Sequence, residues 1–224
     1  MSLFKSFFIL FLLQHSVLAF EIGNVGFYSQ VALPLGDLAA VEGPQAGSHK
    51  LGAGLGVEID LPMFRTVNWL STVSFSMHRY LESTYPGAIP IRMLDAFYFR
   101  HLSVLTGLKY QHEASDDLDL FYLVQVGMNR MSIPSFEGVS SSDGQLDKVR
   151  YTYNPSSHIG VAVGMGFYLN ERFAMSLRYV NFGKNSSKGL IEVNDDRIWI
   201  DEVDMFETNV SMILMTFGVN FEFY

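Results

Sequence analysis

The segment at residues 51–61, LGAGLGVEIDL, alternates strictly between two kinds of side chain. Its odd positions are all apolar, namely Leu51, Ala53, Leu55, Val57, Ile59 and Leu61. Its even positions are glycine or acidic, namely Gly52, Gly54, Gly56, Glu58 and Asp60. Because successive side chains of a β-strand point to opposite faces, this period of two predicts a strand with one wholly apolar face.

The glycine face of this strand indicates its surroundings. Glycine in a strand loses much backbone entropy on folding and packs nothing, so a face that looks into water rarely carries three of them. The narrow interior of a small closed barrel suits such a face. The apolar face then points outward, which in a membrane barrel is the side of the lipid.

The same alternation recurs along the rest of the chain, in residues 24–33, 69–80, 97–111, 120–133, 158–169, 173–183 and 215–224. The connections between these segments are alternately long and short. The long ones, read as loops, are residues 34–49, 81–93, 134–157 and 184–207. The short ones are residues 62–68, 112–119 and 170–172. Outer-membrane barrels have short periplasmic turns and long extracellular loops, so the sequence predicts an all-β fold, an eight-stranded antiparallel up-and-down transmembrane β-barrel, with the long loops outside.

The first residues of the chain predict export. Lys5 precedes an apolar run at residues 7–13, and Val17 and Ala19 fit a signal-peptidase site, so residues 1–19 are expected to be a signal peptide and residues 20–224 the barrel domain. An N-terminal anchor is the alternative, but no run of about 18 apolar residues follows. Removing residues 1–19 takes away Lys5 and no acid, which changes the net charge from −8 to −9. An acidic chain of this kind is a poor binder of nucleic acid.

Cysteine is absent from the chain, which excludes disulfides, thiolate metal sites and cysteine nucleophiles. One of the predicted loops has internal structure: the segments LIEV and RIWI flank residues 194–196 and predict a hairpin that rises beyond the membrane. Such a hairpin could be an adhesive or receptor edge, or could merely close the top of the barrel.

Several segments together resemble a known family. They are GAGLGVEIDL, LSVLTGLKY, FYLVQVGMNR, IGVAVGMGFYL, FAMSLRYVNFG and FGVNFEFY, and their order and spacing are similar to those of the bacterial outer-membrane β-barrel domain family of small eight-stranded barrels. The resemblance implies a monomer in the outer membrane of a Gram-negative cell, among outer-membrane lipid and lipopolysaccharide. It also implies periplasmic chaperones and the barrel-assembly machinery as partners during biogenesis. The assembly signal would be the closing residues Phe217, Val219, Phe221, Phe223 and Tyr224.

Four charged residues fall on the inward phase of the predicted strands, namely Glu58, Lys109, Arg178 and Glu222. An eight-stranded interior is just wide enough for side chains to fill, and isolated buried charges are costly. We therefore expect two acids to pair with two bases in a polar plug across the lower half of the barrel, with no continuous water path. Asp60 is expected at the periplasmic mouth, in water.

Candidate chemistry is weak elsewhere. His101 and Ser103 resemble part of the His-x-Ser-Asn motif of lipid A deacylases, but Val104 stands in place of the Asn and no third orienting group is evident. The acids of the last long loop could bind Ca²⁺, but their spacing matches no EF-hand and a solvated acidic surface is favoured. These acids are Glu192, Asp195, Asp196, Asp201, Glu202, Asp204 and Glu207. No catalytic residue, metal or cofactor is assigned.

The sequence thus favours a non-enzymatic integral membrane barrel with a structural or cell-surface interaction role, through an extracellular partner of its long loops. A narrow, porin-like pore or small-ligand channel is the alternative. A membrane enzyme similar to the lipid A deacylases is the third and weakest hypothesis.

Overall fold

A computed structural model describes residues 23–40, 49–80, 92–93, 98–142, 145–193, 196–198 and 206–222. The predicted signal peptide, residues 1–19, lies outside the described residues.

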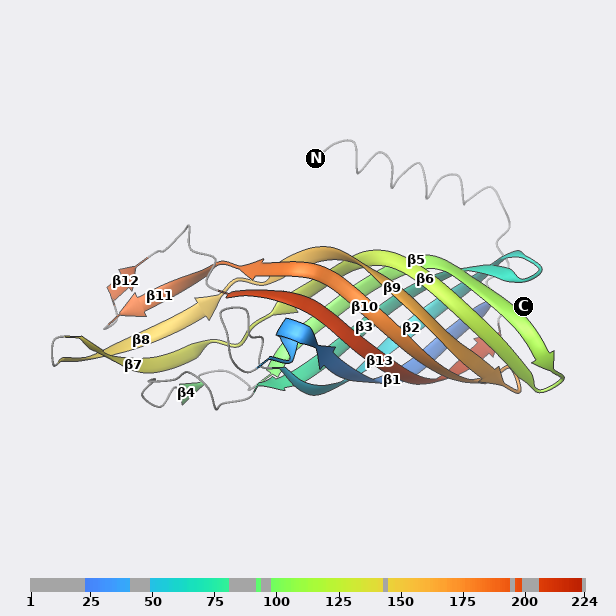
Figure 1. Ribbon diagram of the computed structural model, residues 1–224, viewed down its shortest axis with the longest axis horizontal. Coiled ribbons are helices and arrows are strands. Elements are labelled where there is room, and N and C mark those ends of the chain that lie inside the picture. Colours follow the sequence, from blue (N-terminus) through green and yellow to red (C-terminus); the bar gives the residue numbers. More distant parts are fainter. Residues whose placement is uncertain are drawn as a thin grey trace, which may run out of the picture.

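Eight strands form a closed barrel (Figure 1). They are β1 (Asn24–Leu35), β2 (His49–Phe64), β3 (Val67–Tyr80), β5 (Tyr98–Ser115), β6 (Leu118–Ser132), β9 (Ser156–Leu169), β10 (Phe173–Ser187) and β13 (Phe206–Glu222). Each strand pairs antiparallel with the barrel strand that follows it, and β13 pairs with β1 to close the ring. The predicted fold class and all eight strands are therefore confirmed.

Three tight turns lie at one end of the barrel, which we call the turn end. They are residues 65–66, 116–117 and 170–172. Each falls within a connection that the sequence predicts to be short. The third turn has the predicted bounds, whereas the strands that flank the first two run further into those connections than expected. In the third turn Asn170 and Glu171 have φ angles of 50° and 58°. The opposite end is called the distal end below.

A second, five-stranded sheet extends the molecule beyond the distal end (Figure 1). This distal sheet has the order β12-β11-β8-β7-β4. Its strands are β4 (Arg92–Met93), β7 (Phe136–Ser142), β8 (Gln145–Tyr153), β11 (Gly189–Val193) and β12 (Asp196–Ile198). The hairpin predicted around residues 194–196 is confirmed, because Ile191 pairs with Ile198 and Val193 with Asp196.

The prediction that residues 134–157 form a loop is wrong, since they contain the β7–β8 hairpin. Ser142 pairs with Gln145, so only Asp143 and Gly144 separate the two strands. Asp-Gly is a strong signal for a two-residue hairpin turn, but the serines and glycines around it suggested a loop. The segment at residues 34–49 also contains a short 3-10 helix, η1 (Gly36–Leu38).

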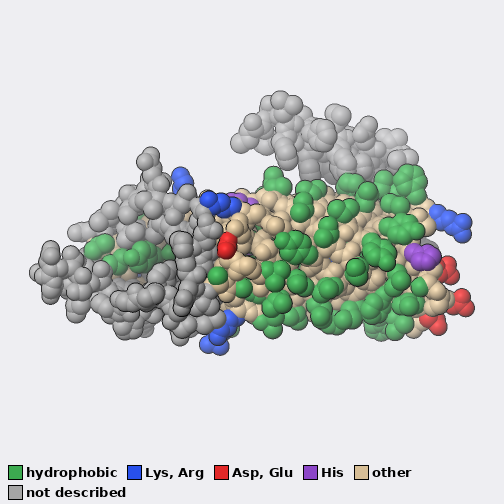
Figure 2. Space-filling model, in the orientation of Figure 1, with side chains coloured by type: hydrophobic (Ala, Val, Ile, Leu, Met, Phe, Trp, Pro, Cys, Tyr) green, Lys and Arg blue, Asp and Glu red, His purple; other side chains and the backbone are tan. Residues whose placement is uncertain are grey.

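The outside of the barrel is apolar, as the alternation predicts. Figure 2 shows hydrophobic side chains over the barrel wall and charged side chains at its ends. Val57 is half-buried on this face, whereas Leu55, Val124 and Val163 are 68%, 53% and 48% exposed. A water-soluble monomer rarely exposes a large continuous apolar surface, so this wall faces lipid and the strands span a membrane. The described segments contain no helix long and apolar enough to cross one.

Candidate functional site

One ion pair in the lumen joins Arg178 of β10 to Glu58 of β2. The Arg178 side chain is 3% exposed and the Glu58 side chain 12%. The guanidinium Nε donates to Ser176 Oγ at 3.0 Å, and its carbon lies 5.7 Å from the centre of the Tyr28 ring. Arg178 therefore has a charge partner, a hydroxyl acceptor and an aromatic face, which together offset the loss of water around a buried cation.

A second ion pair joins Lys109 of β5 to Asp60 of β2, also inside the barrel. The Lys109 ammonium donates to the Tyr168 hydroxyl at 2.9 Å and lies 4.7 Å from the centre of that ring. The Phe121 ring centre is 5.7 Å away on another strand. The two bases of the expected network are thus both paired with acids of β2.

The choice of the second acid differs from the expectation. Asp60 was expected in water at the mouth, but it is 4% exposed and paired with Lys109, whereas Glu222 is exposed. Glu222 lines a pocket of about 130 Å³ at the turn end, with Asn24, Asn220 and Asp119. The reason is strand tilt: barrel strands incline by about 35–45°, so residues at one register position do not lie at one depth. Asn24 of β1 is the register partner of Glu222 on one neighbouring strand and of Asp60 on the other, yet only the Asp60 side chain is buried in the interior.

The space around the first ion pair is almost full. A cavity bordered by Tyr28, Glu58 and Arg178 measures about 10 Å³, which is about the least that a water molecule needs. Glycines provide the room that the large side chains occupy. A β-carbon at Gly164 would lie 2.9 Å from Cγ of Arg178, and one at Gly56 would clash with the Tyr28 ring. This explains the glycine-rich inward face of the strands.

A large apolar cluster occupies much of the distal half of the lumen, and the sequence did not predict it. The cluster consists of Ala32, Leu38, Phe99, Leu105, Met131, Ile133, Ala162, Val180, Phe182, Val210, Met212 and Leu214. Leu38 comes from η1 and is completely buried. The signal was present, because inward positions near the distal strand ends carry Phe and Met where the rest of that face carries Gly and Ser.

Three buried histidines lie beside this cluster, His49, His78 and His101, with ring centres 5.0–5.6 Å apart. The His49 ring also stacks on Phe99 at 3.7 Å. Within the described part of the chain, no three histidine or acidic side chains are placed to hold a metal ion.

The His101 and Ser103 pair, considered for a lipid hydrolase, is buried in the lumen. Ser103 Oγ donates to Asn129 Oδ1 at 3.0 Å, and Asn129 Nδ2 lies 3.2 Å from His101 Nδ1. Asn129 of β6 therefore stands between the hydroxyl and the imidazole. In this arrangement the imidazole is not positioned to take the proton of the Ser103 hydroxyl, which a serine hydrolase requires.

The distal sheet carries a row of alternating charges across its strands. Arg150 on β8 lies 3.8 Å from Glu137 on β7 and 3.4 Å from Glu192 on β11, and Lys148 lies 2.6 Å from Glu137. The register places Arg92 of β4 opposite Glu137 and Arg197 of β12 opposite Glu192. Opposite charges directly across from one another stabilise an antiparallel pair, so the ion pairs of Arg150 favour the observed register of β7, β8 and β11.

The other face of the distal sheet is anchored to the barrel. Val149 is 7% exposed, and Tyr153 packs against the apolar cluster of the lumen. Of the seven acids considered for Ca²⁺, Glu192 is committed to Arg150. Asp195, Asp201, Glu202 and Asp204 lie outside the described residues, and the side chains of Asp196 and Glu207 are not described.

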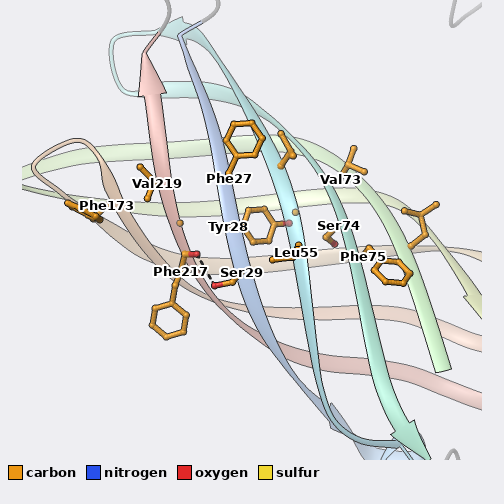
Figure 3. Close-up of a pocket in the computed structure, with 14 residues that line it drawn as sticks. Phe27, Tyr28, Ser29, Leu55, Val73, Ser74, Phe75, Phe173, Phe217 and Val219 are labelled. Carbon is orange, nitrogen blue, oxygen red and sulfur yellow. Dashed lines mark hydrogen bonds between the residues drawn. The ribbon is translucent and has the colours of Figure 1, made fainter. Parts of the chain in front are cut away.

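The wall itself has a shallow apolar groove of about 700 Å³ over β13, β1, β2 and β3 (Figure 3). Phe27, Leu55, Phe75 and Val219 line it, and at its floor Ser29 Oγ donates to the Phe217 carbonyl at 3.4 Å. The groove lies on the apolar outer side of the barrel, which faces lipid.

The residues expected to form the assembly signal follow the same outward phase. Phe217, Val219 and Phe221 are 44%, 37% and 51% exposed on the wall. Phe223 and Tyr224 lie outside the described residues.

The closed strand order, the apolar wall and the filled lumen define an eight-stranded transmembrane β-barrel of the outer-membrane type. Solved structures of such barrels are similar in fold. Neisserial surface protein A (NspA) is 13% identical, with a TM-score of 0.46 over 89% of this chain and 96% of that one. Ail, the attachment invasion locus protein of Yersinia pestis, is 14% identical, with a TM-score of 0.45 over 89% and 99%.

The N-terminal β-barrel domain of Pseudomonas aeruginosa OprF is 10% identical, with a TM-score of 0.41 over 89% of this chain and 98% of that one. No protein-family model matches the sequence. No curated protein matches it either. These likenesses concern the fold alone.

Proposed function

We propose that this chain is a non-enzymatic integral protein of the outer membrane that acts at the cell surface through its distal sheet. Residues 1–19 direct export, and the closing strand is read by the barrel-assembly machinery after transport by periplasmic chaperones. The mature protein sits as a monomer among outer-membrane lipid and lipopolysaccharide, with the turn end in the periplasm. The distal sheet then projects outside the cell.

The observation that carries this proposal is that the distal sheet is an ordered structure beyond the lipid-facing wall. Its register is supported by the charge row around Arg150, and Tyr153 packs its inner face against the apolar cluster of the lumen. A chain that served only to close the barrel would need no five-stranded extension. A hydrogen-bonded sheet that carries charged side chains and is held away from the membrane is suited to contact another macromolecule.

The filled lumen supports this function over the narrow pore. The half of the lumen near the turn end holds two ion pairs, with about 10 Å³ of space beside one of them, and an apolar cluster with three buried histidines beside it occupies the distal half. His101 and Ser103 are buried in the lumen, away from lipid, and each hydrogen-bonds to Asn129, which supports a non-enzymatic role.

The test uses proteoliposomes that carry either the wild type or a variant in which residues 138–148 are replaced by two glycines. Adhesion is measured to immobilised collagen, fibronectin, mucin and serum proteins. Retained heat-modifiable mobility on gels shows that the variant still forms its barrel. We expect adhesion to at least one of these surfaces, lost in the variant. Equal adhesion of both proteins to every surface would contradict the proposal.

A further inference from the structure

Three exposed arginines lie at the distal border of the apolar wall: Arg79 on β3, Arg100 on β5 and Arg130 on β6. Each has the outward phase of its strand, because the wall residues Met77, Leu102 and Met128 lie two positions away on the same strands. The arginines are therefore the next outward side chains beyond the apolar surface.

The strand register places these arginines in one row. Arg79 pairs with Tyr98, two residues from Arg100, and Arg100 pairs with Ser132, two residues from Arg130. Diagonal neighbours of this kind on one sheet face are about 7–8 Å apart, within reach of long side chains. Three arginines thus lie on neighbouring strands along one border of the wall.

Among the described residues, no acidic side chain forms an ion pair with these arginines, and the two ion pairs inside the lumen are those of Lys109 and Arg178. The residues paired directly with Arg79, Arg100 and Arg130 on the neighbouring strands are uncharged. They are Tyr98, Met77, Ser132, Leu102 and Ser157. Like charges side by side on a sheet are unfavourable, so an external anion would stabilise the row.

The border of the wall at the turn end is mainly acidic. Exposed acids gather at the turn end, namely Glu113, Asp116, Asp117, Glu171 and Glu222, with Arg65 and Arg172 among them. Figure 2 shows acidic side chains with a basic one at that end, and mainly Lys and Arg side chains, with an acidic one, where the hydrophobic wall meets the distal end. An anion in the membrane plane is therefore attracted to the distal border and not to the turn end.

We propose that Arg79, Arg100 and Arg130 bind the phosphate monoester of a membrane lipid in the leaflet at the distal end, while the acyl chains of that lipid lie on the wall below. Guanidinium groups bind phosphate oxygens through paired N–H donors, a geometry that lysine does not offer. The three arginines lie at the border of the apolar wall, which is the depth at which the phosphate groups of membrane lipids lie. The inference rests on the proposed function for its orientation, which makes this leaflet the outer one.

The test measures lipid retention by native mass spectrometry on the detergent-solubilised full-length protein. The probes are phosphatidic acid, which carries a phosphate monoester, and phosphatidylcholine with the same acyl chains. Arg100→Gln/Arg130→Gln is compared with Arg65→Gln/Arg172→Gln, a control that removes the same charge at the turn end. Arg100→Lys/Arg130→Lys keeps the charge but loses the paired donors.

We expect the wild type and the turn-end control to retain phosphatidic acid over phosphatidylcholine. Removing two interfacial charges should weaken retention about tenfold or more. The double-lysine variant should fall between, and excess inorganic phosphate should not compete, because it lacks the acyl chains. Equal retention by the wild type and the double-glutamine variant would overturn the proposal, as would an equal loss in the turn-end control. Adhesion through residues 138–148 does not involve these arginines, so failure here leaves the proposed function untouched.

Discussion

At the residue scale, Arg178 is the side chain on which the stability of the lumen near the turn end depends most. Arg178→Leu should destabilise the barrel by about 3–5 kcal/mol, because it leaves Glu58 buried without its partner. Adding Glu58→Leu should recover part of that loss, since two apolar side chains replace the pair. Urea titration of the vesicle-embedded protein, followed by tryptophan fluorescence, measures both values. Small, additive effects of the two single changes would show that the pair does not act as a unit.

The two acids near the turn end offer a sharper comparison. Asp60→Asn should be costly because Asp60 is the buried partner of Lys109, whereas Glu222→Gln should change the free energy of unfolding by only about 0.5 kcal/mol because Glu222 is exposed. The same urea titration ranks them. The reverse order would mean that Glu222, which the sequence places in the lumen network, is a buried ion-pair partner and Asp60 is not.

At the element scale, strand β9 tests which face meets lipid. Val163 lies near its middle and Leu169 at its turn end, and both side chains are exposed on the wall. Val163→Arg should destabilise the folded protein in lipid by about 2–4 kcal/mol, and Leu169→Arg by only about 0–1 kcal/mol, because the penalty for a charge falls toward the interface. Folding titrations in vesicles give both numbers, and equal penalties would show that Val163 is not at the membrane midplane.

Strand β8 tests the charge row of the distal sheet. Arg150→Glu would place three acids side by side at one register position, in β7, β8 and β11. Like charges directly opposite destabilise strand pairing, so limited proteolysis should cut within residues 136–153 faster than in the wild type. The barrel should keep its heat-modifiable mobility. Arg172→Glu, at the turn end, is the matched control and should leave the cutting rate unchanged.

At the scale of the whole molecule, the filled lumen predicts that the protein does not conduct. Ion pairs fill the lumen near the turn end, and the apolar cluster fills it near the distal end. No continuous water path through the barrel is therefore expected. Planar-bilayer recordings of the wild type should show no stable conductance. A steady ohmic current whose ion selectivity changes with Arg178→Leu would establish the channel function instead.

The sequence alone determined the strands, their faces and the barrel. Side chains of a strand alternate with a period of two, so runs such as residues 51–61 and 158–169 define which residues meet lipid without any knowledge of their neighbours. The short turns are local as well, which is why the antiparallel order of the barrel could be predicted. The inward phase of Glu58, Lys109 and Arg178 followed from the same rule.

Only the tertiary structure decided which charges meet and how the distal end is built. The partner of Lys109 depends on strand tilt, because the tilt sets the depth of Asp60 and Glu222 in the lumen. The alternation of apolar and polar residues along one strand does not reveal this tilt. The distal sheet joins β8 to β11 between residues far apart in the chain, and the arginine row joins three strands. Such residues come together because their strands pair. The periodicity within one strand does not reveal the register in which a neighbouring strand pairs with it.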